Sequence, residues 1–296
     1  MPKRSTIKLR RYIARNLSGV VMFAYSIKIH LLSFKKNPPV IILTPGKVGS
    51  SSVYHTLKKH ISNPVFHIHQ ISEQGIKLST IEHLNSDRKS LPLHLIISNL
   101  LRKRLENYDG HKFIICIVRE PISREISAFY QNTEFYKSIV EKNNLEIDTN
   151  ASLNILKRIF SGNITQHLEN WFQTEIYLEF GIDIFSKPFN PQKGYQLFHT
   201  KNTSLLLLKM ETMKNVFTKA IKELLEIHKE FSLENENIAE NKHYATSYAE
   251  AKKSFRLNKV QMDEIIQSKY FQHFYAEQEK AIREKWQKEN MNRNSL

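Results

Sequence analysis

The chain has 296 residues and a mass of 34.9 kDa, and its 41% hydrophobic and 25% charged residues are the balance of a globular protein. Its net charge of +15 favours an anionic partner, such as a nucleotide, a phospholipid, an acidic glycan or a nucleic acid. The single cysteine, Cys116, excludes an internal disulfide and favours a reducing, cytoplasmic location.

The first 36 residues are basic. Residues 1–36 carry nine Lys and Arg and no Asp or Glu. The apolar part, 18–34, contains Lys28 and His30 and lacks the roughly 20 apolar residues of a membrane-spanning helix. No small-residue cleavage site follows, so we do not expect a signal peptide. Two interpretations stay open: a basic lead-in followed by a docked helix, or an amphipathic segment lying on the anionic inner face of a membrane.

The stretch 40–58 predicts a strand, a tight turn and a helix. Val40–Leu43 is a short apolar run, typical of a strand buried on both faces, and Pro45 with Gly46 ends it. Backbone N–H groups and the positive end of a helix dipole would then point at one place, which favours a phosphate or sulfate. The residues expected to bind that anion are Lys47, Gly49, Ser50, Ser51 and Ser52.

This turn differs from the P-loop of nucleoside-triphosphate enzymes. The P-loop has four residues between its glycines and a lysine directly before Ser or Thr. Here two residues separate Gly46 from Gly49, and Lys47 comes before the second glycine. We therefore expect no metal. The alternative interpretation is an ordinary strand–turn–helix junction whose helix is capped by Ser50.

A second strand is predicted at 65–70, after the break at Asn63–Pro64. Alternation places His67 and His69 on one face of this strand. Because ligand sites form beyond the carboxyl ends of parallel strands, His69 is the better placed of the two for chemistry. For each of the two histidines, the alternative interpretation is a buried residue with a structural role. Residues 75–107 are predicted to be helical.

Lys112–Val118 predicts a third, buried strand that ends at Arg119, and 122–132 predicts the helix that follows. Ser127 would lie about 9 Å along that helix, at about 1.5 Å per residue. An arginine at the end of a strand and a hydroxyl on the next helix can converge on one phosphate. A surface arginine and a solvent-facing serine are the alternative.

The remaining chain predicts mostly helices. Trp171 and Phe172 either pack in the core or form the floor of a glycan groove. The predicted elements are a helix at 164–180, a loop at 184–194, a strand at 205–210, a helix to about 228, a polar connection at 230–241 and a helix at 269–288. We expect an α/β fold with a central, mostly parallel sheet flanked by helices, a helical C-terminal part, and residues 37–290 as a single domain.

Two motifs carry a resemblance to sulfotransferases that use 3′-phosphoadenosine 5′-phosphosulfate (PAPS). Residues 44–52, TPGKVGSSS, resemble the 5′-phosphosulfate loop of these enzymes, and Arg119-Glu120-Pro121 with Ser127 resembles their 3′-phosphate site. The rest of the chain is similar to the bacterial NKWYS family of capsular polysaccharide synthesis proteins. The segments that carry this second resemblance are 171–176, 181–183, 194–195, 205–211, 244–248 and 269–275. Together they extend the resemblance over most of residues 40–290.

The resemblance implies a P-loop-like sulfotransferase fold and transfer of a sulfuryl group from PAPS to a hydroxyl of a carbohydrate, such as a capsular or cell-surface polysaccharide. It assigns the phosphosulfate to Lys47, Gly49, Ser50, Ser51 and Ser52, and the 3′-phosphate to Arg119 and Ser127. Glu120 departs from the neutral residue that many sulfotransferases have there.

Our catalytic hypothesis is that His69 is the base, with His67 as its alternate or partner, and that Lys47 neutralises charge on the leaving oxygen. Two other functions stay open. One is a nucleotide-dependent kinase, and the other is a non-catalytic basic protein that binds anions or a membrane. The expected partner is a glycan acceptor, with an anionic membrane surface as a further option through residues 1–36, and no nucleic acid is expected.

Overall fold

The computed structural model describes residues 18–85, 91–132, 149–234 and 245–288. Its centre is a five-stranded sheet in the order β2-β1-β3-β5-β4, in which β4 alone is antiparallel to its neighbour. This confirms the predicted mixed α/β fold with a mostly parallel sheet. The strands are β1 (Val40–Leu43), β2 (Val65–Ile68), β3 (Lys112–Val118), β4 (Tyr195–Thr200) and β5 (Thr203–Lys209).

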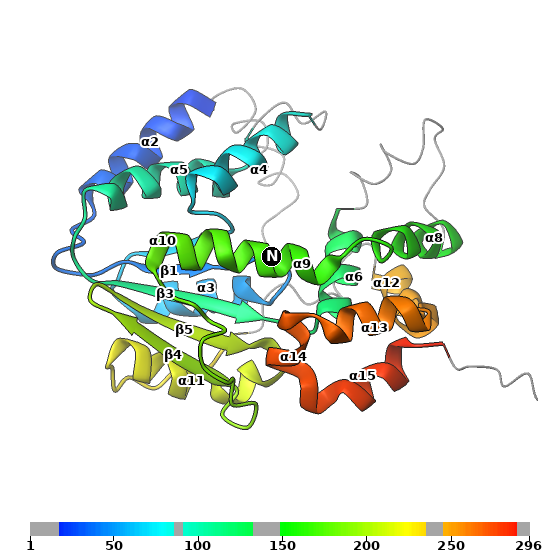
Figure 1. Ribbon diagram of the computed structural model, residues 1–296. Helices are drawn as coiled ribbons and strands as arrows, with labels where there is room; N and C mark the ends of the chain where they lie inside the picture. The colour runs from blue at the N-terminus through cyan, green and yellow to red at the C-terminus, as the bar shows by residue number, and fades with distance from the viewer. Residues whose placement is uncertain (1–17, 86–90, 133–148, 235–244, 289–296) are drawn as a thin grey trace, which may run out of the picture.

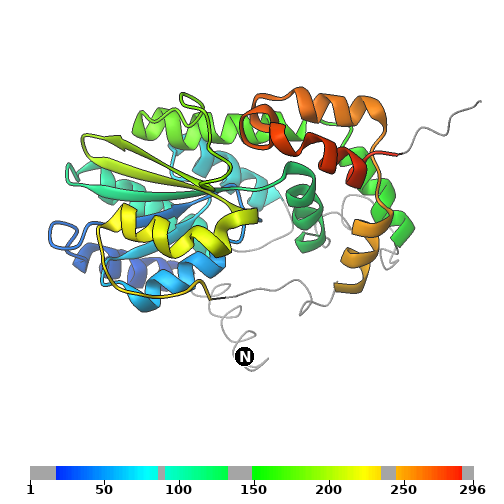
Figure 2. The same cartoon turned by 90° about the horizontal axis from the view of Figure 1, so that it is seen from below.

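Helices cover both faces of the sheet (Figures 1 and 2). α3 and α11 pack on one face, while α5, α9 and α14 belong to the larger core on the other. The helices before residue 200 are α2 (Ser18–Leu31), α3 (Ser50–His60), α4 (Glu73–Asn85), α5 (Leu93–Glu106), α6 (Pro121–Gln131), α8 (Thr149–Ile159), α9 (Ile164–Phe172), the π-turn η1 (Gln173–Tyr177) and α10 (Leu178–Phe180). Those after it are α11 (Met210–Leu225), α12 (Ala245–Ser254), α13 (Lys259–Gln267), α14 (Lys269–Tyr275), the short η3 (Ala276–Gln278) and α15 (Glu279–Trp286).

The three apolar runs form the central strands because each is buried on both faces. In β1, Ile41 and Leu43 enter the larger core, while Val40 and Ile42 enter the core under α3 and α11. β5 is buried along its whole length. Strands covered by helices on both sides need apolar residues at every position rather than at alternate ones. No helix within the described ranges is long and apolar enough to cross a membrane.

Several boundaries differ from the predictions. The helical stretch expected over 75–107 consists of two helices, α4 and α5, and Pro92, which cannot continue a helix, stands at the N-cap of α5. β4 was not predicted, and the helix expected over 164–180 contains the π-turn η1. Two predicted segments lie partly outside the described residues: the connection at 230–241 from residue 235 on, and the basic segment 1–36 up to residue 17.

The sheet topology marks where a ligand would bind. After β1 the chain goes to β2 on one side, and then crosses to β3 on the other side of β1. In open α/β sheets the crevice beyond the carboxyl ends of two such strands is left open by the diverging connections. Here that switch point lies between the loop after Leu43 and the loop after Val118.

Candidate functional site

The loop after β1 has an unusual backbone. Gly46, Lys47 and Gly49 all have positive φ, at 81°, 62° and 77°. For lysine this left-handed conformation is uncommon and strained, and such strain is found where the surrounding structure or a function requires it. Turns in which left-handed and other backbone conformations follow one another can form the concave N–H sites that bind anions.

The start of α3 corrects the alternative interpretation of Ser50 as an N-cap. Gly49 is the N-cap residue, and it offers no side chain to the first turn of the helix. Ser50 is already helical, and its hydroxyl lies 2.8 Å from His67 Nε2. Ser50 and Ser52 are buried, Ser51 is half-buried, and the three serines form the beginning of α3; their assignment to an anion stays a prediction. The helix N-terminus therefore faces the loop without a capping side chain.

Arg119 connects the two loops at the switch point. Its guanidinium donates a hydrogen bond of 2.7 Å from Nη1 to the carbonyl oxygen of Lys47. Its backbone is fixed by Tyr270, whose hydroxyl accepts from Arg119 N at 3.1 Å and donates to Arg119 O at 2.9 Å. The side chains predicted to bind the two ends of one ligand thus belong to loops that touch.

A second arginine, which the sequence analysis missed, reaches the same loop. Arg124 on α6 is only 7% exposed and donates from Nη2 to the carbonyl oxygen of Pro45 at 2.9 Å. Its Nη1 pairs with Glu125 at 2.7 Å. Its Nε and the hydroxyl of Thr44 are buried and have no hydrogen-bond partner in the part of the chain that the structure describes. Buried polar groups left in this way mark a place where a ligand or water completes the bonding.

Ser127 is the predicted residue that the structure does not bring to the loop. It lies half-buried on α6, one helical turn beyond Arg124. No hydrogen bond or ion pair of the described residues joins it to residues 44–49 or to Arg119. Its assignment to a phosphate stays a prediction.

Three imidazoles lie next to the loop. The strand predicted over 65–70 ends at Ile68, one residue before His69. His67 in β2 and His69 directly after it have ring centroids 5.3 Å apart, and His94 from α5 lies 5.3 Å from His69. Burial, followed by the charges of neighbouring histidines, lowers the pKa of His67 to about 3 and that of His94 to about 4. His67 contacts Ser50 and His69 contacts the carbonyl of Thr44, so the pair lies against the anion loop and the start of α3.

His69 is held in one tautomer. Its Nδ1 lies 2.8 Å from the carbonyl oxygen of Thr44, and since a carbonyl only accepts, the proton is on Nδ1 and the lone pair is on Nε2. Burial lowers the pKa of His69, and the positive charges of Lys47 and Arg124 lower it further, against the opposing effect of the Thr44 hydrogen bond. A Cβ at Gly46 would lie 3.8 Å from His69 Cε1, so the ring edge lies along the loop. At neutral pH His69 is an uncharged proton acceptor.

Two buried carboxylates shape this edge of the sheet. Glu120 caps α6 by accepting from Ile122 N and Ser123 N, and it also accepts from Trp286 Nε1 at 3.2 Å. This acidic residue therefore has a structural task that joins α6 to α15. Burial raises the pKa of Glu120.

Glu175, in the π-turn η1, binds backbone N–H groups of the segment after β2. It accepts from Ile71 N at 2.6 Å and from Ser72 N at 2.8 Å. Beside it Trp171 donates from Nε1 to His69 O at 2.8 Å. Trp171 and Phe172 are 8% and 2% exposed, so the structure uses both in the core rather than in a glycan groove.

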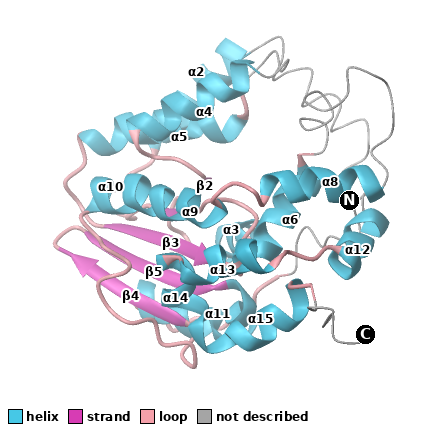
Figure 3. Ribbon diagram, turned by 45° about the vertical axis from the view of Figure 1, so that its right-hand side comes forward, coloured by secondary structure: helices cyan, strands magenta, loops and turns pink. Residues whose placement is uncertain are grey.

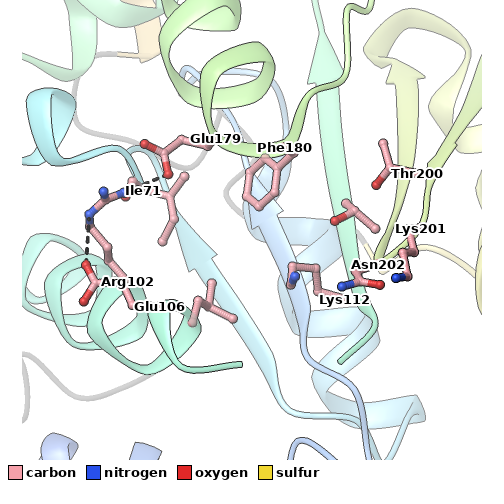
Figure 4. A pocket seen from close by; sticks show the side chains of 11 residues that line it. Ile71, Arg102, Glu106, Lys112, Glu179, Phe180, Thr200, Lys201 and Asn202 are labelled. Atoms are coloured by element: carbon pink, nitrogen blue, oxygen red, sulfur yellow. Dashed lines mark hydrogen bonds and ion pairs between the residues drawn. The ribbon is translucent and has the colours of Figure 1, made fainter. Parts of the chain in front are cut away.

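A cavity of about 400 Å³ lies away from this site, between α5, α10 and the amino-terminal ends of β3 and β5 (Figure 4). Arg102 points toward it, but its guanidinium is paired with Glu179 at 2.8 Å and Glu106 at 3.6 Å. The positive charge of Arg102 is therefore largely compensated, in contrast with the cationic loop at the switch point. Within the described ranges, no group of three or more His, Cys, Asp or Glu side chains is placed to hold a metal ion.

Comparison with protein families gives one match. The family model described as "Putative capsular polysaccharide synthesis protein" (NKWYS) matches residues 144–276. This range is narrower than the resemblance expected from sequence. Outside it lie the loop at 44–49, His67, His69 and Arg119. Neither the curated proteins nor the solved structures give a significant match to this chain.

Proposed function

We propose that this protein is a sulfotransferase that moves a sulfuryl group from PAPS to a hydroxyl of a carbohydrate, in the synthesis of a capsular or other cell-surface polysaccharide. The observation that carries the proposal is the hydrogen bond from Arg119 to the carbonyl of Lys47, because it joins the two anion-binding motifs at the switch point of the sheet. The description of the family matched at 144–276 supports the polysaccharide part.

The residues present fit a ligand with two anionic ends. Lys47, Arg119 and Arg124 bring three positive charges to the loop, of which that of Arg124 is partly balanced by Glu125, while the nearest histidines stay neutral. Among the described residues, Nε of Arg124 and the hydroxyl of Thr44 have no hydrogen-bond partner, so both can donate to a ligand. The left-handed residues Gly46 and Gly49 place the turn next to the N-terminus of α3, where a helix favours an anion.

The chemistry follows from these positions. Nε2 of His69 accepts the proton of the acceptor hydroxyl while that oxygen bonds to sulfur and the bond from sulfur to the 5′-phosphate oxygen breaks. Lys47 stabilises the negative charge that grows on the departing phosphate oxygen. The lone pair on His69 Nε2 is ready because the Thr44 carbonyl holds the proton on Nδ1. His67, whose Nε2 bonds Ser50, links the imidazole pair to the anion loop.

Thermal shift with two nucleotides tests the cofactor. We expect adenosine 3′,5′-bisphosphate to raise the melting temperature, and ATP with Mg²⁺ to raise it much less. Lys47→Ala and Arg119→Ala should each remove most of the shift. A stronger response to ATP with Mg²⁺ would favour a kinase and overturn the proposal.

Sulfuryl transfer from labelled PAPS to a preparation of the producing cell's polysaccharide tests the catalytic assignment. His69→Ala should bind adenosine 3′,5′-bisphosphate as the wild type does, yet lose transfer by a factor of about 10² or more. His228→Ala, at an exposed histidine after α11, is the matched control and should keep full transfer. Undiminished turnover in His69→Ala would remove this residue from the mechanism.

A further inference from the structure

The outer helices α2 and α4 expose an unusual amount of apolar surface. Both pack on α5, away from the sheet (Figures 1 and 3). Of the twelve large apolar side chains that are exposed within the described ranges, nine belong to these two helices or to the first residue of α5. We call the eight on the two helices the α2–α4 surface: Val20, Met22, Phe23, Ile27, Leu31, Leu78, Ile81 and Leu84.

On α2 these residues form a stripe. At about 100° per residue, Val20, Phe23, Ile27 and Leu31 fall within about 80° of the helix circumference. Phe23 is 67% exposed and Leu31 is 76% exposed, whereas Ile29, on the opposite side of the helix, is 4% exposed. The helix thus uses one apolar side to dock on the protein and presents a second apolar side outward. A contiguous apolar patch of this kind marks an interaction surface.

The charges around the stripe are positive. Lys28 and His30 lie on its two sides, and Lys35 and Lys36 follow the helix in exposed positions. The 17 residues before α2 add six Lys and Arg and no acidic residue. A protein partner with an ordinary apolar interface does not require this excess of charge, whereas an anionic bilayer attracts basic residues next to an apolar helix face.

We infer that the α2–α4 surface docks on an anionic membrane, with the stripe of α2 inserted among the lipid headgroups and the basic residues next to it over the negative phosphates. Leu78, Ile81 and Leu84 of α4 extend the apolar contact from a second helix of the same layer. The inference rests on exposure and charge, and it does not depend on the proposed transfer reaction.

Sedimentation of the full chain with lipid vesicles tests this docking. We expect binding to vesicles of phosphatidylcholine with phosphatidylglycerol, little binding to phosphatidylcholine alone, and weaker binding at 0.5 M than at 0.05 M salt because surface charges are screened. Phe23→Ser with Leu31→Ser should reduce the partition coefficient at least tenfold. Lys35→Glu with Lys36→Glu should reduce it on anionic vesicles specifically.

The matched control is Tyr177→Ser with Val260→Ser, which also removes two exposed large side chains but from outside the surface. It should bind vesicles as the wild type does. All these positions are exposed, and an unchanged melting temperature shows that each variant is folded. Equal pelleting of wild type and Phe23→Ser/Leu31→Ser would overturn the inference. A second outcome would also overturn it: the wild type does not bind anionic vesicles, is a dimer by light scattering, and Phe23→Ser/Leu31→Ser is a monomer. The surface would then bind a second copy of the chain.

Discussion

Acid should destabilise this protein through the imidazoles beside the anion loop. Burial and the charges of His69, His94 and His55, in that order, lower the pKa of His67 from 6.5 to about 3. Below pH 6.5 the unfolded chain therefore takes up a proton at this position while the folded protein does not. The contribution of His67 to stability is complete above pH 6.5 and is lost progressively as the pH falls toward 3.

The size of the effect follows from these two pKa values. Between pH 7 and pH 5, one histidine with a pKa of about 3 when folded and 6.5 when unfolded lowers the free energy of unfolding by about 2 kcal/mol. His94, with a pKa of about 4, adds a similar loss over the same range. Because the rings lie close together, the two losses are coupled and need not add.

Urea unfolding at pH 7 and pH 5 measures this loss. In His67→Gln the difference in stability between the two pH values should be smaller than in the wild type by about 2 kcal/mol. His228→Gln, at an exposed position after α11, is the control for the loss of one imidazole. The raised pKa values of Glu120 and Glu175 act with the opposite sign, but they are present in every variant and cancel in the comparison. An equal pH dependence in wild type and His67→Gln would refute the buried, neutral imidazole.

Three further changes probe the same region. Gly49→Ala should cost about 1–2 kcal/mol in urea unfolding, because an alanine at a φ of 77° is strained. Glu175→Ala should lower the free energy of unfolding by about 2–3 kcal/mol, since it leaves Ile71 N and Ser72 N without their acceptor. Glu175→Gln, which keeps an acceptor oxygen, should lower it less. Equal losses in the two variants would argue against these hydrogen bonds. The acid limb of the pH–rate profile of transfer should lie below 6.5, because the pKa of His69 is lowered, and a limb above 6.5 would exclude His69 as the base.

The sequence was most informative about the central strands. Val40–Leu43 and Lys112–Val118 are recognisable because strands covered on both faces consist of uninterrupted apolar residues. β4 was harder, since it is an edge strand whose His199 and Thr200 are exposed, and its pairing with β5 is a tertiary contact. Its alternating apolar residues after Gly194 are the signal that could have identified it.

The candidate site was predictable in part for a related reason. Lys47 and Arg119 each follow a strand directly, and the topology of a parallel sheet brings such residues to one edge. Arg124, His94 and Glu175 reach the same edge from helices, through contacts that no local pattern encodes. At about 100° per residue, Arg124 lies opposite the apolar face of α6 that Ile122 and Ile126 belong to, so helical periodicity gives no signal for its burial.

The central claim is that two loops bind the two ends of one nucleotide. Calorimetric titration of adenosine 3′,5′-bisphosphate, 5′-AMP and 3′-AMP into wild type, Lys47→Ala and Arg119→Ala tests it most directly. We predict that Lys47→Ala weakens 5′-AMP more than 3′-AMP, that Arg119→Ala does the reverse, and that both weaken the bisphosphate at least tenfold. Bisphosphate affinities equal to that of the wild type in both variants would contradict the account.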